Sequence, residues 1–464
     1  MKKKTILDEI QNKELTAPAL PEASPNELFK PIIIKTIPKV EFNIMPAFPH
    51  HAAREVINIF IGYCLNINSK ARRFVIQCNL INGTKELCDS SMTHPTIGGT
   101  SAVWNETLTL PLQIKTIPRS ARIAITLYDY DLLKTKKRSA AALATYNFPV
   151  FTFDGWLNTG WKRMNMWNGK DLDPILTTCE SQDPAAIKIF FKIPQYKFPI
   201  TFIKGDIHKS NSMRVSNELI QRCEKVYDKI KIDPLYALTK EDKEAIWHCR
   251  HHSICTTHAL MLPRVLQSLD YTVPTQVIEI PGLLQEYTEN SNPQPSEVLS
   301  LLDADFADEA IRSYAVSRLE QFTDSEVMLY MLQLVQALKY EIYDDSPLLQ
   351  FLFKRGIKEP KFLGHALFWQ LMSEAHISHI QRRFSLIVMN FLYGIGSYTD
   401  ELLKGYLFTQ KLVKLNESLS NLSHTEALAP FQKALQDIEI PKEFHLPMDP
   451  RLVVESFIIE NVKL

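Results

Sequence analysis

Two carboxylates lie beside a run of cations in the first third of the chain. Asp129 and Asp131 follow residues 121–128, whose alternating apolar side chains predict a strand. An Asp-x-Asp pair at a loop of a β-sandwich can bind calcium, which needs several carboxylate and carbonyl oxygens. Here the loop continues with basic residues, and the loop over residues 66–70 contains no Asp either. We therefore predict no metal site at this position.

The basic residues of this loop suit an anionic ligand instead. The candidate membrane contacts are Lys134, Lys136, Lys137 and Arg138. Each cation near an anionic bilayer contributes on the order of 1 kcal/mol to binding, and Lys70, Arg72 and Arg73 could add to this charge. An ordinary solvated loop is the alternative interpretation.

Residues 248–258 contain four histidines and two cysteines. Imidazole and thiolate are zinc ligands, and some of these residues lie one helical turn apart. A closed zinc site needs four ligands, and no distant Cys or His pair has finger spacing. We expect a helix after Trp247 that packs its apolar side and exposes its imidazoles.

One short segment weakly resembles a motif for phosphoryl transfer. Residues 205–211 resemble a kinase catalytic loop, in which an Asp positions the acceptor hydroxyl and an Asn binds magnesium. No Asp-Phe-Gly follows, no glycine-rich phosphate loop precedes it, and Gly394-Ile395-Gly396 lacks a third glycine. We predict no catalytic, cofactor-binding or metal-binding residue in this chain.

The composition narrows the class of protein. The 52 Lys and Arg residues balance 52 Asp and Glu residues, which argues against a nucleic-acid partner. The seven cysteines are irregularly spaced, as is typical of reduced thiols in the cytosol. No stretch has the roughly 20 apolar residues of a bilayer span, and no signal core follows Met1. We expect a cytoplasmic protein, peripheral to membranes.

The chain divides into regions of different pattern. Residues 1–50 are rich in proline and predict a linker or arm. Short strands with turn signals over residues 51–203 indicate an antiparallel β-sandwich. From about Ser216 onward a helical period indicates an α-solenoid of packed helix pairs, and we place a linker over residues 204–232 and the helical domain over residues 233–425. Residues 426–464 look like the opening of a further domain.

Long motifs in the helical region resemble a known family. Residues 330–341, and residues 364–376 with their run Gly364-His365-Ala366-Leu367-Phe368-Trp369, resemble the helical accessory (PIK) domain of phosphoinositide 3-kinases. Asp308 with residues 311–316 is similar to an earlier signature of that domain, and residues 233–247 are similar to its first helix.

The upstream and downstream segments extend the resemblance. Trp104-Asn105-Glu106, residues 117–122 and residues 151–160 resemble the C2 domain of the same enzymes. Residues 446–450 resemble the segment just before the kinase N-lobe. The resemblance therefore implies an eight-stranded C2 sandwich followed by a HEAT-like helical solenoid, and a kinase N-lobe that is cut short.

The resemblance also implies a role. The family transfers the ATP γ-phosphoryl to the inositol 3-hydroxyl, but its catalytic motifs would lie beyond Leu464. We therefore expect a class I-like scaffold that is inactive alone, with ATP and magnesium bound only by the missing kinase domain. The expected partners are an anionic phospholipid membrane, a kinase domain in cis or in trans, and a regulatory subunit. The alternative is a non-catalytic membrane and protein interaction scaffold derived from such a kinase.

The chain departs from class I enzymes at two points. The stretch that carries acidic residues in animal class I subunits has Ala237 and Lys240 here, so an acidic docking surface is not expected. The residues before position 50 are also too few for adaptor-binding and Ras-binding domains. A Ras-type input is therefore not predicted from this chain.

Overall fold

The structure is a computed structural model that describes residues 47–135, 141–168, 180–203, 215–419 and 424–459. The proline-rich arm predicted over residues 1–50 lies almost wholly outside these ranges. Within the described residues, no helix combines the length and the apolar character needed to cross a bilayer.

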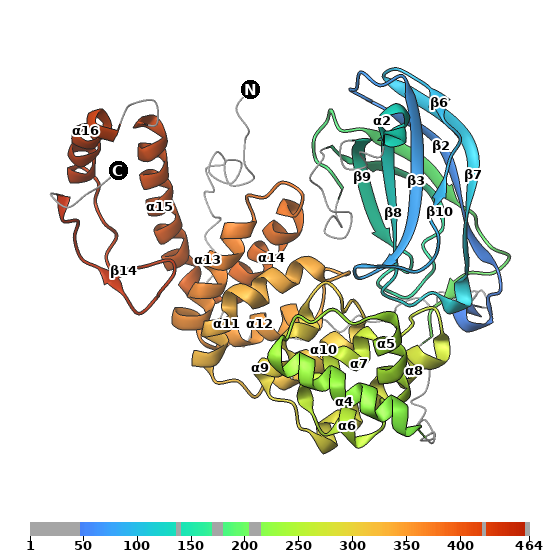
Figure 1. The fold of residues 1–464 in the computed structure, drawn as a ribbon. Helices are drawn as coiled ribbons and strands as arrows, with labels where there is room; N and C mark the ends of the chain where they lie inside the picture. Colours follow the sequence, from blue (N-terminus) through green and yellow to red (C-terminus); the bar gives the residue numbers. More distant parts are fainter. Residues whose placement is uncertain (1–46, 136–140, 169–179, 204–214, 420–423, 460–464) are drawn as a thin grey trace, which may run out of the picture. The chain divides into compact units, whose positions relative to one another are not determined.

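Two antiparallel sheets form the N-terminal half (Figure 1). The first has the order β10-β12-β2-β7, and the second has the order β11-β9-β8-β3, with short pieces along the free edge of β3. Their bounds are β2 (Val56–Leu65), β3 (Arg73–Asn82), β4 (Lys85–Glu86), β5 (Ser91–Met92), β6 (Thr96–Ile97), β7 (Ser101–Gln113), β8 (Arg122–Asp129), β9 (Ala142–Pro149), β10 (Gly160–Asn165), β11 (Trp167–Asn168) and β12 (Lys188–Ile193). Two further short strands, β1 (Phe48–Pro49) and β13 (Ile200–Thr201), pair in parallel. The predicted antiparallel sandwich is confirmed.

The sandwich core follows from strand alternation. Along β2, Ile57, Ile59 and Ile61 are buried while the residues between them are partly exposed, because successive side chains point to opposite faces. Phe74 of β3 and Phe191 of β12 are buried in the same core. The buried apolar area between the sheets stabilises the domain by roughly 25 cal/mol per Å².

Helices make up most of the rest of the described chain. Their bounds are α4 (Asn217–Ile232), α5 (Lys240–His248), α6 (Ser253–Thr256), α7 (Leu262–Gln267), α8 (Pro274–Asn290), α9 (Pro295–Val298), α10 (Glu309–Leu319), α11 (Asp324–Ala337), α12 (Pro347–Lys358), α13 (His365–Glu374), α14 (Gln381–Gly394), α15 (Thr399–Leu419) and α16 (His424–Gln436), after the short α2 (Tyr130–Lys134) of the sandwich. Alternate helices pack on one another: α8 contacts α10, α10 contacts α12, and α11 contacts α13. This succession is that of the predicted solenoid.

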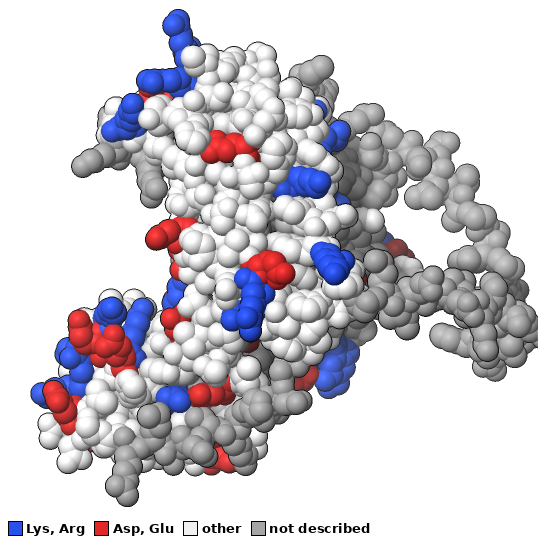
Figure 2. All heavy atoms as spheres, turned by 90° about the vertical axis from the view of Figure 1, so that its right-hand side faces the viewer, with Lys and Arg blue, Asp and Glu red and all other residues white. Residues whose placement is uncertain are grey.

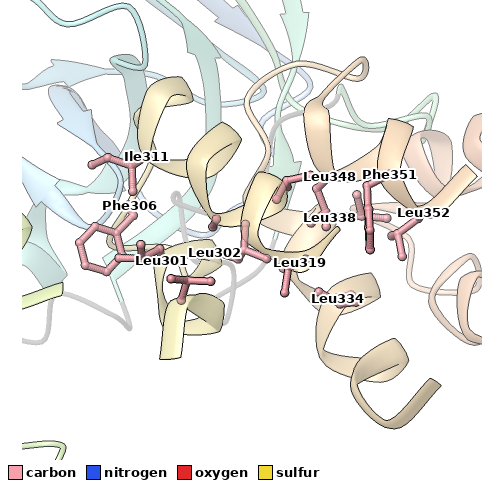
Figure 3. Packing of buried hydrophobic residues seen from close by; sticks show 14 of the residues in the cluster. Leu301, Leu302, Phe306, Ile311, Leu319, Leu334, Leu338, Leu348, Phe351 and Leu352 are labelled. Atoms are coloured by element: carbon pink, nitrogen blue, oxygen red, sulfur yellow. The ribbon is translucent and has the colours of Figure 1, made fainter. Parts of the chain in front are cut away.

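Capping residues determine where helices begin, and packing between the helices forms one hydrophobic core. Capping boxes begin α5 at Thr239 and α11 at Thr323, where each threonine and the carboxylate three residues later satisfy free backbone N–H groups. Apolar residues of α10, α11 and α12 then share one buried cluster, in which Figure 3 shows Leu319, Leu334 and Phe351. The helical repeat brings such residues to one face, so the helices bury them against each other.

Two predicted boundaries are wrong. Helix α4 lies in the range predicted as a linker, 204–232, and buries Cys223, Val226 and Ile230 in the helical core. The helical region therefore begins near Ser216, whose side chain caps α4. The boundary predicted after residue 425 falls inside α16. The helical period of α4 is visible in the sequence, but its packing into the helical core, which makes it part of that domain and not a linker, is decided by the tertiary structure.

A short hairpin, β14 (Phe444–His445) with β15 (Val453–Val454), follows α16 and is held by His365. The His365 Nε2–H donates to the Leu446 carbonyl at 3.1 Å, so Nδ1 accepts from the Tyr398 hydroxyl at 3.2 Å. This pattern needs the neutral imidazole. Burial lowers the pKa of His365 to about 4.

The lowered pKa of His365 predicts a loss of stability in acid. Between pH 6.5 and about 4 the unfolded chain binds a proton at His365 that the folded chain does not, so the free energy of unfolding falls as the pH falls through this window. The loss is on the order of 3 kcal/mol. His365→Gln keeps a donor but does not titrate, so we expect a shallower pH dependence in urea unfolding.

The comparison is made between wild type and His365→Gln, because His50 also has a pKa lowered to about 4 by burial and titrates in both proteins. Identical slopes of unfolding free energy against pH would contradict the prediction.

Candidate functional site: the basic end of the sandwich and its contact with the helices

Cations gather where β2 passes into β3 and where β8 passes into α2; we call Lys70, Arg72, Arg73 and Lys134 the basic end. All four side chains are exposed. The Tyr130 ring lies between two of them, with the Arg73 guanidinium 5.2 Å and the Lys134 ammonium 4.6 Å from its centre. These cation–π contacts hold the basic side chains over one aromatic surface.

The two carboxylates of the Asp-x-Asp pair have structural roles. Asp129 caps α2 by accepting from the backbone N–H groups of Asp131 and Leu132 at 2.9 and 3.2 Å. Asp131 pairs with Arg73, whose Nε lies 3.3 Å from the carboxylate, and this hydrogen bond raises the pKa of Arg73. Within the described ranges, no group of three or more His, Cys, Asp or Glu side chains could hold a metal ion.

One candidate membrane contact can be placed. Lys134 ends α2 at the basic end and is exposed. Lys136, Lys137 and Arg138 lie outside the described residues, as do residues 205–211. Among the residues that the structure describes, Lys70, Arg72 and Lys134 have no carboxylate within ion-pair distance, whereas Arg73 is neutralised by Asp131.

The His- and Cys-rich segment differs from its prediction. Helix α5 ends at His248, a turn follows, and the side chains then separate. His251 pairs with Glu286 at 2.6 Å, His258 stacks on Tyr227 at 4.1 Å, and Cys255 is buried in the helical core. The expectation of one helix is wrong because the chain turns at Cys249, and His251 and His258 contact other helices, whereas His248 is exposed as expected.

The end of the sandwich that carries the β3–β4 turn packs on the helices. The Lys85 ammonium donates to the Gln267 carbonyl at 2.8 Å, and Thr84 donates to the Asp305 carboxylate. Burial, with a further contribution from Lys243, lowers the pKa of Lys85. A desolvated cation at such a contact is tolerated because the carbonyl and nearby carboxylates face it.

A second contact joins the two regions through Tyr343. Its hydroxyl donates to the Phe151 carbonyl at 2.9 Å, and its ring meets Phe153 edge to face at 5.7 Å. The Arg119 guanidinium lies 5.5 Å from the same ring, and its Nε is 3.6 Å from the Glu309 carboxylate. The sandwich and the helices are therefore joined by directional contacts at separated points.

Sequence reasoning did not identify this interface. Arg119 lies within residues 117–122, one of the motifs that carried the family resemblance, but nothing in the sequence pairs it with Tyr343, more than two hundred positions away. Gly83 gave no signal either, although its φ of +59° and its approach to Ala304 make it a contact residue.

The comparisons with known proteins agree with this architecture. Residues 70–201 match the family model described as phosphoinositide 3-kinase C2. Residues 213–404 match the model described as phosphoinositide 3-kinase family, accessory domain (PIK domain). The second match begins before residue 217, in agreement with α4 as part of the helical region.

Curated relatives cover most of this chain. It is 28% identical to phosphatidylinositol 3-kinase 1 of Dictyostelium discoideum over 84% of its length, and 32% identical to phosphatidylinositol 3-kinase 3 of that organism over 78%. It is 26% identical, over 83% of its length, to the human phosphatidylinositol 4-phosphate 3-kinase C2 domain-containing subunit beta. The chain spans only 26%, 21% and 24% of these relatives. With both domain models matched in order, the chain belongs to the phosphoinositide 3-kinase family and carries its C2 and accessory domains.

Proposed function

We propose that this chain is the membrane-docking and kinase-supporting part of a phosphatidylinositol 3-kinase. Such an enzyme transfers the γ-phosphoryl of ATP to the inositol 3-hydroxyl of a lipid in the bilayer. ATP and magnesium would be bound by a kinase domain acting in cis or in trans. The role of the described residues is to orient that domain, because positioning lowers the barrier of a reaction between two bound substrates.

The observation that carries this proposal is the basic end on a sandwich that is fixed to the helices. Lys70, Arg72 and Lys134 face solvent at one end, and the β3–β4 turn and Tyr343 fasten the domain to the accessory helices. Figure 2 shows Lys and Arg side chains at the uppermost end of the molecule, where Figure 1 places α2. A bilayer held by this end would have a defined orientation toward the helices.

Charge reversal of the basic end tests the docking step. We expect the triple variant Lys70→Glu, Arg72→Glu, Lys134→Glu to lower the partition coefficient onto phosphatidylcholine vesicles containing phosphatidylserine by at least about tenfold, because three favourable charge interactions become repulsive. Co-sedimentation at low ionic strength measures this, and added salt should weaken wild-type binding.

A matched variant separates a local contact from net charge. Lys225, Lys361 and Lys411 are exposed cations on the accessory region, and their reversal to Glu changes the net charge equally. This control should bind the vesicles almost as wild type does. Equal losses in both triple variants, or none in either, would refute docking by the basic end.

The kinase-supporting role has its own test at the level of the gene. We expect the coding sequence after Leu464 to contain a kinase catalytic loop and an Asp-Phe-Gly motif. A stop codon followed by unrelated sequence would instead favour the non-catalytic scaffold.

A further inference from the structure

The outward side of the sheet β10-β12-β2-β7 carries aromatic and cationic side chains in rows; we call these outward residues the outer face. Strand register places Trp161 beside Lys192 and Lys192 beside Phe60. The Lys192 ammonium lies 5.6 Å from the Trp161 ring centre, and Phe60 meets Trp161 edge to face at 5.9 Å. Cation and aromatic rings therefore alternate across three strands.

The next row repeats this composition. Arg163 lies beside Phe190, and Phe190 lies beside Tyr63 in the register. The Phe190 and Tyr63 rings stack with their centres 4.3 Å apart. Arg163 is exposed, and the two rings are partly exposed. The face thus holds flat apolar surface with cations at its edge.

No Asp or Glu occupies an outward position of these four strands over their described lengths. Figure 2 looks from the right-hand side of Figure 1, where β7, β2 and β10 lie, and shows Lys and Arg side chains and a few Asp and Glu side chains spaced over a mostly uncharged surface. The Trp161 residue has 64% of its surface exposed to solvent, which is unusual for so large an apolar side chain. The outward strand positions therefore carry cations and no carboxylates, although the whole chain has equal numbers of acidic and basic residues.

We propose that the outer face is a second membrane contact, which lies against an anionic phospholipid bilayer with Trp161 in the headgroup layer. Tryptophan prefers this layer because its ring is apolar and its N–H remains hydrated. Lysine and arginine place their alkyl chains along apolar surface and keep the charge at the phosphates. The combination of exposed indole, paired rings and cations without carboxylates has both properties.

The position of the outer face fits simultaneous contact with the basic end. Its third row, Lys188 beside Leu65, lies where β2 runs into the loop that carries Lys70 and Arg72. The two surfaces are therefore continuous, and a sandwich tilted on the bilayer presents both. This inference rests on the proposed membrane docking and adds a defined tilt of the sandwich relative to the bilayer.

Fluorescence quenching by lipid tests the position of Trp161. Vesicles of phosphatidylserine and brominated phosphatidylcholine quench indoles that enter the bilayer interface. We expect wild type to be quenched on binding and Trp161→Phe to lose most of this quenching. The matched control is Trp156→Phe, which removes an indole that is 42% exposed elsewhere in the sandwich and should leave the quenching unchanged.

Charge reversal tests the cations of the outer face. Arg163→Glu with Lys192→Glu should lower the partition coefficient about tenfold, while Lys225→Glu with Lys361→Glu should not. Each variant is compared with wild type by its thermal unfolding midpoint, so that a folding defect is not read as lost binding.

The two proposals fail in different ways. If the basic-end triple variant loses binding while the outer-face variants bind and are quenched as wild type, the outer-face contact is refuted and the docking proposal stands. Such a result would assign the outer face to a protein partner. If the outer-face variants lose binding and the basic-end variant does not, docking by the basic end is refuted and the outer-face contact stands.

Discussion

Arg312→Met should lower the free energy of unfolding by about 3–5 kcal/mol, because it leaves a buried carboxylate without its counterion. The Arg312 guanidinium is 3% exposed, and its Nε and Nη2 donate to one oxygen of Glu341 at 3.0 and 2.9 Å. It also donates to the Leu302 carbonyl at 2.8 Å and to the Ala337 carbonyl at 3.1 Å. One side chain thus joins the loop before α10 to the end of α11.

The measurement is urea unfolding followed by far-ultraviolet circular dichroism. Lys354→Met is the control, since it breaks the exposed Lys354–Glu320 pair of 2.8 Å and should cost at most about 1 kcal/mol. The double variant Arg312→Met, Glu341→Leu should recover part of the loss, because no lone charge then stays buried. A loss for Arg312→Met no larger than that for Lys354→Met would contradict this account.

Gly83→Ala should separate the C2 domain from the accessory domain. Gly83 has a φ of +59°, where a side chain costs roughly 1–2 kcal/mol. An added Cβ would also lie 2.6 Å from the Ala304 carbonyl oxygen and 2.9 Å from that of Asp305. The turn and the facing loop must therefore move apart, which weakens the contacts of Thr84 and Lys85. We expect faster amide hydrogen exchange in residues 83–87 and 303–308.

Gly160→Ala provides the control for backbone strain alone. Gly160 has a φ of +95°, but its added Cβ would meet nothing within 4 Å. This variant should lose stability within the sandwich without changing hydrogen exchange in residues 303–308. Unchanged exchange at the interface in Gly83→Ala would show that the two domains are not coupled through this turn.

Two of the motifs that resemble the family contain residues with structural contacts. Arg312 belongs to the stretch 311–316 that resembles an accessory-domain signature, and its contacts show that the signature holds the helices together. Arg119 lies in a C2-like motif and contacts Tyr343 and Glu309 of the helical region. Both are structural residues, so motifs that identify a family need not mark its chemistry.

The order of the two folds could be predicted from local pattern. Apolar residues at every second position, such as Ile57, Ile59 and Ile61, indicate a strand with one buried face. Apolar residues at three- and four-residue spacing indicate helices. These signals come from neighbours in sequence and need no knowledge of the rest of the chain. Helix α4 also shows this spacing, in Cys223, Val226 and Ile230, but its packing on α5 and α6, which makes it part of the helical domain, depends on the tertiary structure.

The candidate site could be predicted only in part. The sequence indicated a basic loop that begins at Lys134, and the structure places this exposed lysine at the end of the short helix α2. It did not indicate that Asp129 caps that helix or that Asp131 neutralises Arg73, because a carboxylate near a loop has the same sequence pattern whether it binds a metal, a cation or backbone N–H groups.

The sequence by itself determined the family, the sandwich followed by the solenoid, and the balance of charge. Only the tertiary structure decided which residues meet: Trp161 with Lys192 and Phe60 on the outer face, and Gly83 against Ala304 at the domain contact. Periodicity fixes the face on which a side chain lies. Its neighbours on that face depend on strand register and domain packing, which bring together residues that are far apart in the chain.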